Sequence, residues 1–363
     1  MNAAKALAKS LPADRRVVLL EAAEQVFWPI AALRAAVVPN FENELFATID
    51  SVFPVGSRHI ARAGTRVVEV TNSDVLVRKL DGGDEERIPF ERAILATGAT
   101  YPSPARVVSD KTAEAKAAIR NIQAGIKEAH SILIVGGGEV GVEIAGEIRA
   151  YYPDAEAKKI TLVSRGDKLV GKGTPASLHN KLYYQLGKSG VAVLLADSVD
   201  LGDDISESGP LGSPRTFTTK KGKSIADVDF VIIATGTKPA VELFAKADPA
   251  SVTEAGIKVD KKTLRVQSDV LTNWHAVGDV ADLANKTSVN AESGGGVVAA
   301  NVVSLLKGGN GAAKSFASTN VTAVPLGPKG GAINLFGLVL GEWTISLIKG
   351  RTLFVSKFKG WYA

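Results

Sequence analysis

The sequence predicts an α/β protein of two domains, each built on a parallel sheet with an antiparallel flap, followed by a small C-terminal extension. Three observations support this fold class. Short apolar strands alternate with helices, a pattern typical of parallel βαβ units with helices on both faces of a sheet. A glycine-rich turn directly follows one of these strands. Residues 93–98 (AILATG) recur as 231–236 (VIIATG), and such a repeat indicates two related domains.

Length and composition agree with this organisation. A chain of 363 residues is too long for one ordinary core, and a hydrophobic fraction of 45% with 22% charged residues is normal for a globular protein. The net charge is +5, but the Lys and Arg residues are scattered along the chain. We therefore expect a solvated basic surface and no specific nucleic-acid partner.

The residue types exclude several kinds of chemistry. The absence of cysteine rules out disulfides, thiolate nucleophiles and cysteine-ligated zinc. The four histidines form no metal-ligand spacing, so no metal site is predicted. Chemistry must rest on a bound organic cofactor or on carboxylates, lysines and hydroxyls.

The expected domain bounds follow from the order of the strands. Residues 1–112 would form the first part of one domain, 113–245 a second domain, 246–310 the rest of the first, and 311–363 the extension. The basic N-terminal segment reads better as a helix of the fold than as a transit peptide, because it leads directly into an apolar strand at 17–20. The stretch 201–214 is expected to be a surface excursion, and 307–314 a linker.

Several strands and one helix are predicted in detail. The residues 65–70 and 74–79 should form an antiparallel flap around the turn at Asn72 and Ser73. A strand at 131–135 should lead through the glycine turn into a helix at 140–151. Further strands are expected at 160–163, 191–195, 215–219, 227–233 and 274–277.

The glycine turn is the motif with the clearest chemistry. Gly136, Gly138 and Gly141 fit G-x-G-x-x-G between a strand and a helix. The first glycine allows a tight turn, the second admits the pyrophosphate close to the backbone, and the third permits close packing of helix and strand. Together with the repeat of 93–98 at 231–236, this motif predicts two Rossmann-like, three-layer dinucleotide-binding domains. The alternative is a tight βα turn with no ligand.

The next strand bears on cofactor choice. It ends in Ser164 and Arg165 without a carboxylate, so Arg165 could pair with a 2′-phosphate, and we expect both NADH and NADPH to be accepted. Glu143, two residues past the last glycine, could reach the nicotinamide or flavin edge as a catalytic group. The alternative is an exposed glutamate in the first turns of a helix.

Four short segments of the sequence resemble a known family. These are 31–35 (AALRA), the two A-T-G turns, and 276–279 (AVGD). Together they resemble the apoptosis-inducing-factor-like, ferroptosis-suppressor-type branch of the pyridine nucleotide-disulfide oxidoreductase superfamily. The resemblance implies FAD in the first domain, NAD(P)H in the second, hydride transfer between them, and electrons passed to an acceptor that is typically a quinone.

The resemblance also implies roles for individual residues. Glu21 would bind the FAD adenosine ribose, Arg34 and Val67 would make further FAD contacts, and Asp279 would hold the ribityl or pyrophosphate region. Gly98 and Gly236 would shape the two A-T-G cofactor turns. Glu21 and Asp279 could instead be ordinary turn or helix caps. Without cysteine, direct transfer from reduced flavin to the acceptor is what remains.

One departure from the family bears on FAD. Such proteins have a strand and a G-x-G-x-x-G turn for FAD before the ribose acid, and none precedes Glu21 here. We therefore expect weak FAD binding, reduced stability and a first sheet that lacks a strand. The alternative function is a non-catalytic, NAD(P)-binding and partner-binding protein that has lost FAD.

The C-terminal residues mix aromatic and basic side chains. Phe336, Trp343, Phe354, Phe358, Trp361 and Tyr362 are interleaved with Lys349, Arg351, Lys357 and Lys359. This mixture suits a membrane interface or a quinone groove, whereas a packed hairpin or a homodimer surface is the slightly favoured alternative.

Lys349 could be a catalytic cation near a reduced quinone or flavin oxygen, or else a solvated loop lysine. We expect a cytoplasmic protein, peripheral on a mitochondrial or lipid-droplet membrane. Tyr184 and Lys188 have the spacing of a dehydrogenase proton relay, but a chance match on a helix surface is favoured.

Overall fold

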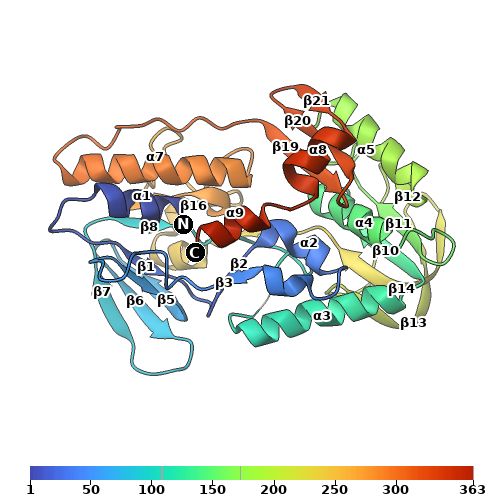
Figure 1. Ribbon diagram of the computed structural model, residues 1–363, viewed down its shortest axis with the longest axis horizontal. Coiled ribbons are helices and arrows are strands. Elements are labelled where there is room, and N and C mark those ends of the chain that lie inside the picture. The colour runs from blue at the N-terminus through green and yellow to red at the C-terminus, as the bar shows by residue number, and fades with distance from the viewer. Residues whose placement is uncertain (108, 172, 363) are drawn as a thin grey trace.

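The computed structural model describes residues 1–107, 109–171 and 173–362. Figure 1 shows two lobes side by side, with the N-terminal helix α1 and the long helix α7 over the left lobe and the main sheet in the right lobe. The last residues of the chain return to the middle of the molecule, so the two termini lie near each other (Figure 1).

The right lobe contains a five-stranded sheet in the spatial order β12, β11, β10, β14, β13. The strands are β10 (Ser131–Val135), β11 (Lys159–Val163), β12 (Val191–Leu194), β13 (Gly209–Thr218) and β14 (Ser224–Ile233). β10 is parallel to both β11 and β14, while β13 is antiparallel to β14. Strands therefore continue from β10 in both directions, which creates the switch point where doubly wound sheets bind ligands.

The two faces of this sheet pack against different layers. Ile132 and Ile134 lie in a core with α3 (Thr112–Glu128), α4 (Glu139–Tyr151) and α5 (Ala176–Lys188). Leu133 and Val231 lie instead in a second core with Phe217 from the β13–β14 hairpin. The third layer is thus an antiparallel hairpin, and the expectation of helices on both faces is wrong for this sheet. Alternating apolar residues need cover on both faces, but they do not specify whether a helix or a strand provides it.

The β13–β14 hairpin also corrects the expected surface excursion. β13 already begins at Gly209, so only the part of 201–214 before that residue lies outside a strand. The pairing shifts register between Pro210 and Arg215, and such irregularities accommodate proline and glycine at the edge of a sheet.

The parallel strands of the left lobe form two separate pairs. β1 (Val18–Leu20) pairs with β4 (Ile60–Arg62), and β8 (Ala93–Leu95) pairs with β18 (Trp274–Ala276). All three side chains of β1 are partly exposed, whereas those of β18 are buried.

The predicted antiparallel flap is confirmed and gains a third strand. It consists of β5 (Thr65–Val70), β6 (Asp74–Lys79) and β7 (Glu86–Pro89). Val70, Val75 and Val77 turn toward the core of the left lobe, as period-two patterning predicts.

The N-terminal segment forms α1 (Asn2–Ser10), which buries Ala4 and Leu7 and lies along α7 (Ser288–Leu306). The prediction that it is a helix of the fold is therefore confirmed. The shorter elements in this lobe and at its border are β2 (Val26–Phe27), η1 (Pro29–Ala31), α2 (Ala32–Ala35), η2 (Phe41–Glu44), β3 (Phe46–Ala47), α6 (Glu242–Ala247), η3 (Pro249–Ser251), β16 (Val252–Thr253), β17 (Gly256–Ile257) and η4 (Gly278–Val280).

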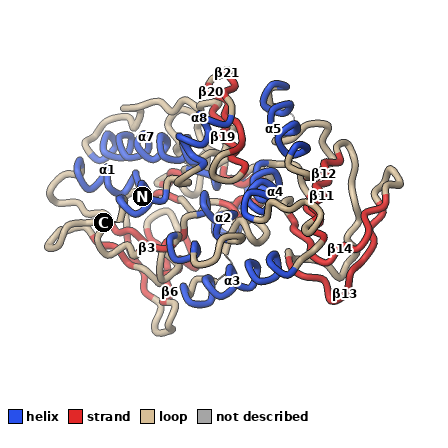
Figure 2. The backbone as a smooth tube through the Cα atoms, turned by 45° about the vertical axis from the view of Figure 1, so that its right-hand side comes forward, coloured by secondary structure: helices blue, strands red, loops and turns tan. Residues whose placement is uncertain are grey.

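The C-terminal extension joins the two lobes. Its antiparallel strands β19 (Val321–Leu326), β20 (Gly330–Leu335) and β21 (Leu338–Leu340) lie against α4 and α5. The chain then forms α8 (Glu342–Ile345), the π-helical turn η5 (Ser346–Gly350) and α9 (Val355–Gly360). Figure 2 shows α8 close to the β19–β21 sheet at the upper edge of the molecule.

The end of the extension packs against the left lobe. Trp28 stacks on Phe358 with ring centroids 5.1 Å apart, and its Nε1 donates a hydrogen bond of 2.8 Å to the carbonyl of Leu353. Trp361 meets the same indole edge-on. This half of the aromatic tail is therefore core, as the packed alternative predicts. No helix in the described part of the chain is long and apolar enough to cross a membrane.

Candidate functional site

Three loops meet at the carboxyl ends of neighbouring parallel strands in the right lobe. Gly136 follows β10, Ser164 follows β11, and Ala234 follows β14. A Cβ on Gly136 would lie 2.5 Å from the Ala234 carbonyl oxygen, and one on Gly137 would lie 2.5 Å from Ser164 Oγ. The loops are therefore in direct contact around the start of α4.

The three motif glycines are required for different reasons. Gly136 has φ of 126°, a conformation that favours glycine, and a Cβ on Gly141 would lie 1.9 Å from the Gly136 carbonyl oxygen. These two positions are explained by the protein itself. Gly138, by contrast, has no atom within 4 Å of its Cβ position. Open space beside this glycine at the start of a helix fits a dinucleotide phosphate, so the residues present fit NAD(P)H.

The ribose position lies at the end of β11. Ser164 is buried and Arg165 is exposed. Arg165 thus directly follows the residue that contacts the glycine turn, and the sequence predicts that its side chain contacts a 2′-phosphate. That contact stays a prediction.

The two A-T-G turns of the internal repeat lie against each other. β9 (Ala99–Thr100) follows Gly98, β15 (Lys238–Pro239) follows Gly236, and the two strands are antiparallel partners. Both glycines have positive φ, 71° at Gly98 and 87° at Gly236. The Ala240 amide donates to the Gly98 carbonyl at 3.0 Å. The repeat therefore forms the crossing between the two domains, a contact that sequence similarity alone does not predict.

The two predicted catalytic residues form an ion pair. Lys349 Nζ, on η5, lies 2.7 Å from Glu143 Oε1, on α4, and also donates to the Ala323 carbonyl at 2.9 Å. Both side chains are largely buried, with 13% and 10% exposed. Burial raises the pKa of the Glu143 carboxyl to about 7, while the charge of Lys349 opposes this shift. The alternatives of a solvated lysine and an exposed helix glutamate are therefore wrong.

A second buried ion pair lies one helical turn further along α4. Arg34 Nη2 lies 2.7 Å from Glu147 Oε1 and Nε lies 2.9 Å from Oε2, with about 5% of each side chain exposed. The same guanidinium donates to the carbonyls of Gly350 and Arg351. The guanidinium thus ties α2 and α4 to the end of η5. The predicted contact of Arg34 with FAD stays a prediction.

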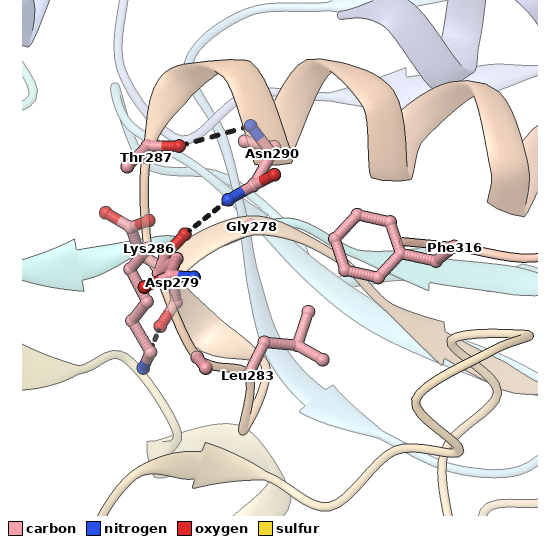
Figure 3. A pocket seen from close by; sticks show the side chains of 10 residues that line it. Gly278, Asp279, Leu283, Lys286, Thr287, Asn290 and Phe316 are labelled. Carbon is pink, nitrogen blue, oxygen red and sulfur yellow. Dashed lines mark hydrogen bonds between the residues drawn. The ribbon is translucent and has the colours of Figure 1, made fainter. Parts of the chain in front are cut away.

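Asp279 lies in a small pocket at the start of α7. Figure 3 shows it beside Lys286, with Thr287 and Asn290 on the first turn of the helix and Phe316 across the pocket. Tyr101 donates a hydrogen bond of 3.2 Å to the Asp279 carboxylate, and burial raises the pKa of Tyr101. The pocket holds about 10 Å³, the space of roughly one water. The acid and the helix start suit the ribityl or pyrophosphate region of FAD, and this role of Asp279 stays a prediction.

The remaining predicted FAD residues lie in the left lobe. Glu21 closes β1, where its Oε1 accepts a hydrogen bond of 3.1 Å from the Ala23 amide, and burial raises the pKa of its carboxyl. Val67 is partly buried on β5 against the core of this lobe. An acid at the end of a strand suits a ribose contact, and this role of Glu21 stays a prediction.

Sequence reasoning missed four residues that the structure brings to these sites. They are Tyr101, Glu147, Lys286 and Thr97, whose Oγ1 donates to the Ala240 carbonyl. Glu147 had a detectable signal, because it lies four residues after Glu143 on the same helix face. Tyr184 is 66% exposed on α5, so it lies on a helix surface as expected. Among the described residues no acidic or histidine cluster could hold a metal ion.

Comparison with known proteins decides the family. The pyridine nucleotide-disulphide oxidoreductase model matches residues 1–295. The chain belongs to this family. Family members use FAD and NAD(P)H, so the family assignment makes this a flavin-dependent NAD(P)H oxidoreductase. Because the sequence contains no cysteine, this member cannot relay electrons through a disulfide.

Curated relatives narrow the branch. The chain is 32% identical over 370 residues to apoptosis-inducing factor homolog A of Dictyostelium discoideum, which covers 97% of this chain and 88% of the relative. It is 30% identical over 334 residues to human ferroptosis suppressor protein 1, and the alignment covers 90% of this chain and 84% of the relative. The predicted resemblance to this branch is confirmed.

Solved structures confirm the fold. A reduced Bacillus anthracis CoADR-RHD structure aligns with a TM-score of 0.66 at 19% identity, covering 89% of this chain and 57% of that one. An NAD-dependent persulfide reductase from A. fulgidus aligns with a TM-score of 0.65 at 19% identity, covering 89% of this chain and 60% of that one. This oxidoreductase chain therefore spans less than two thirds of either solved chain, and the likeness concerns the fold alone.

Proposed function

We propose that this protein is an NAD(P)H:quinone oxidoreductase. The observation that carries the proposal is the buried ion pair between Glu143 and Lys349. Glu143 lies two residues past the last glycine of the glycine turn. Hydride uptake from NAD(P)H and onward electron transfer to an acceptor are the chemistry that a bound FAD supplies.

The residues of this chain would serve the acceptor. Glu143, with a pKa of about 7, can hold a proton near neutral pH at Oε2, because Oε1 accepts the hydrogen bond from Lys349, and can donate that proton to an acceptor oxygen. Lys349 offers a cation to the negative charge that develops on that oxygen. A quinone suits this pair, because its oxygens take up protons as its ring takes up electrons. The burial of both side chains keeps water out of the exchange.

The nucleotide would bind at the glycine turn. Gly138 leaves room for the diphosphate at the start of α4, and Arg165 would pair with the 2′-phosphate of NADPH. Since no carboxylate ends β11, we propose that both NADH and NADPH are substrates.

The test is a visible absorption spectrum of the purified protein, recorded without oxygen before and after NADPH is added. A flavin band that bleaches, and that returns when a short-chain quinone is added, would support the proposal. A flavin band that NADPH bleaches but no quinone restores would contradict the acceptor class.

A second function is favoured by one observation on the FAD side. The parallel strands of the left lobe form two separate pairs. A protein that stays colourless after FAD is added, yet binds NADPH, would be the non-catalytic, nucleotide-binding and partner-binding protein.

We also propose where the protein acts. A quinone is a lipid-soluble acceptor, so we place the protein in the cytoplasm, peripheral on a mitochondrial or lipid-droplet membrane. Cell fractionation tests this: protein found only in the soluble fraction at low salt would contradict it. A homodimer stays a prediction.

A further inference from the structure

The large apolar side chains that remain exposed are concentrated at one place. Of the eleven exposed large hydrophobic residues in the described chain, five lie within 336–348. We call them the exposed apolar edge; they are Phe336 (77% exposed), Leu338 (63%), Trp343 (76%), Leu347 (59%) and Ile348 (38%). Soluble proteins seldom gather large exposed apolar residues in one segment without a binding partner.

Two structural elements form the exposed apolar edge. Phe336 and Leu338 lie at the turn between β20 and β21, while Trp343 and Leu347 are four residues apart on the helical segment of α8 and η5 and share its outer face. Figures 1 and 2 both place the β20–β21 hairpin at the upper edge of the molecule beside α5. The edge is thus a projecting part of the protein.

The turn at Phe336 has a conformation that its residue type disfavours. Leu335 pairs with Leu338, which leaves Phe336 and Gly337 as a two-residue turn with φ of 53° and 99°. Asn-Gly is the usual sequence for such a turn, and a bulky aromatic side chain is unfavourable at its first position. The Phe336 amide donates to the Asn320 carbonyl at 3.3 Å and the Gly337 amide to Asn334 Oδ1 at 3.1 Å, which hold the backbone of the turn, whereas the aromatic side chain stays mostly exposed.

Charge identifies the kind of partner. The extension 311–363 has six Lys or Arg residues and the single acid Glu342, a net charge of +5. Lys349, Lys357 and Lys359 form ion pairs with acids outside the extension, whereas no salt bridge is found for Lys314, Lys329 and Arg351 among the described residues. Lys181 of α5 lies beside the same segment, with its Nζ 4.0 Å from the Cβ position of Gly341. Apolar and aromatic side chains with basic residues around them are typical of surfaces that insert shallowly into anionic bilayers.

We propose that the exposed apolar edge is the surface through which this protein docks onto a bilayer containing anionic lipids. The proposal deepens the membrane association proposed above and rests on it. Ile348 directly precedes Lys349, whose Nζ reaches inward to Glu143. Docking by this edge would therefore place the acceptor site next to the lipid in which a quinone dissolves.

The test is flotation of the full chain with vesicles of phosphatidylcholine alone or mixed with phosphatidylserine. Binding should be stronger to the mixed vesicles and should weaken with salt. Phe336→Asn, which suits the turn, and Trp343→Gln should each weaken binding by about tenfold or more, since burial of a large apolar side chain contributes at least that factor. Val55→Gln and Val270→Gln, at exposed apolar residues outside the edge, should have no effect.

Several outcomes would overturn the proposal. These are a wild-type protein that binds neither kind of vesicle, or edge variants that bind as tightly as wild type. Light scattering provides a further check: a wild-type dimer that Phe336→Asn converts to monomer, with vesicle binding unchanged, would assign the edge to a second copy of this chain. NADPH oxidation by a water-soluble quinone, measured on the same variants, should be unchanged. If the wild-type protein does not oxidise NADPH with this quinone, the proposed chemistry is contradicted, whereas the vesicle-binding result still stands.

Discussion

Lys349 Nζ contacts Glu143 Oε1 at 2.7 Å although 206 positions separate the two residues in the chain. The contact connects the π-helical turn of the C-terminal extension to the helix that follows the glycine turn. π-Helical turns are rare and occur often at functional sites. The extension therefore contributes directly to the proposed acceptor site, and the pair makes that site accessible to a pH experiment.

The first prediction concerns this pH dependence. Because burial raises the pKa of Glu143 to about 7, its carboxyl holds a proton below this pH and loses it above. The rate of quinone reduction should fall as pH rises through about 7 in wild type. Glu143→Gln should lower the rate by about a hundredfold and remove this inflection. An inflection that persists in Glu143→Gln would assign the proton to another group; Lys349→Arg, which keeps the cation, serves as the control.

The second prediction concerns the Arg34–Glu147 pair. Arg34→Ala leaves a buried carboxylate without its partner, which should lower the free energy of unfolding by about 3–5 kcal/mol. The loss should be smaller in Arg34→Met with Glu147→Leu, because no buried charge remains. Urea unfolding measures both. Arg34→Ala should also speed amide hydrogen exchange around Arg351, and unchanged exchange there would contradict the role of Arg34 in tying down η5.

The third prediction distinguishes glycines of the turn that are needed for NADPH binding from those that are needed for folding. Gly138→Ala adds a methyl group to open space at an ordinary backbone conformation, so stability should be kept while NADPH binding weakens by about tenfold or more. Gly141→Ala forces a Cβ against the Gly136 carbonyl, so the fold itself should be destabilised. Thermal unfolding and NADPH titration distinguish the two effects. Tight NADPH binding by Gly138→Ala would contradict a diphosphate at this position.

The fourth prediction concerns Arg165 and the choice of nucleotide. Arg165→Gln should weaken NADPH binding by about tenfold, or about 1.4 kcal/mol, and leave NADH binding unchanged. The control is Lys188→Gln, an exposed lysine on α5 away from the glycine turn. Equal losses for the two nucleotides would mean that Arg165 does not contact the 2′-phosphate.

The fifth prediction concerns acid stability. His275 on β18 is 1% exposed, neither ring nitrogen has a hydrogen-bond partner, and burial lowers its pKa to about 4, with Arg265 and Arg92 adding to the shift. The unfolded chain therefore takes up a proton that the folded chain resists, so stability should fall as pH drops from about 6.5 to about 4. His275→Phe should reduce this loss. A urea midpoint with the same pH dependence in both proteins would show that other groups cause it.

Local pattern sufficed for much of the fold. The strand at 131–135, the helix that follows the glycine turn and the flap at 65–79 were all predicted within a residue or two, because each depends on periodicity and turn residues that neighbours in sequence provide. The family resemblance rested on equally short segments. Local pattern does not predict which element packs on a sheet face, since hairpins and helices satisfy the same apolar pattern. The β13–β14 layer was therefore missed.

The sequence by itself determined the glycine turn, the absence of thiol chemistry and the residue types at the proposed acceptor site. Only the tertiary structure decided which side chains meet there: Lys349 with Glu143, Arg34 with Glu147, and the two A-T-G turns with each other. It also divided the aromatic tail, burying Phe358 against Trp28 while leaving Phe336 exposed. Pairings over such separations depend on how whole elements pack, and no local periodicity encodes that packing.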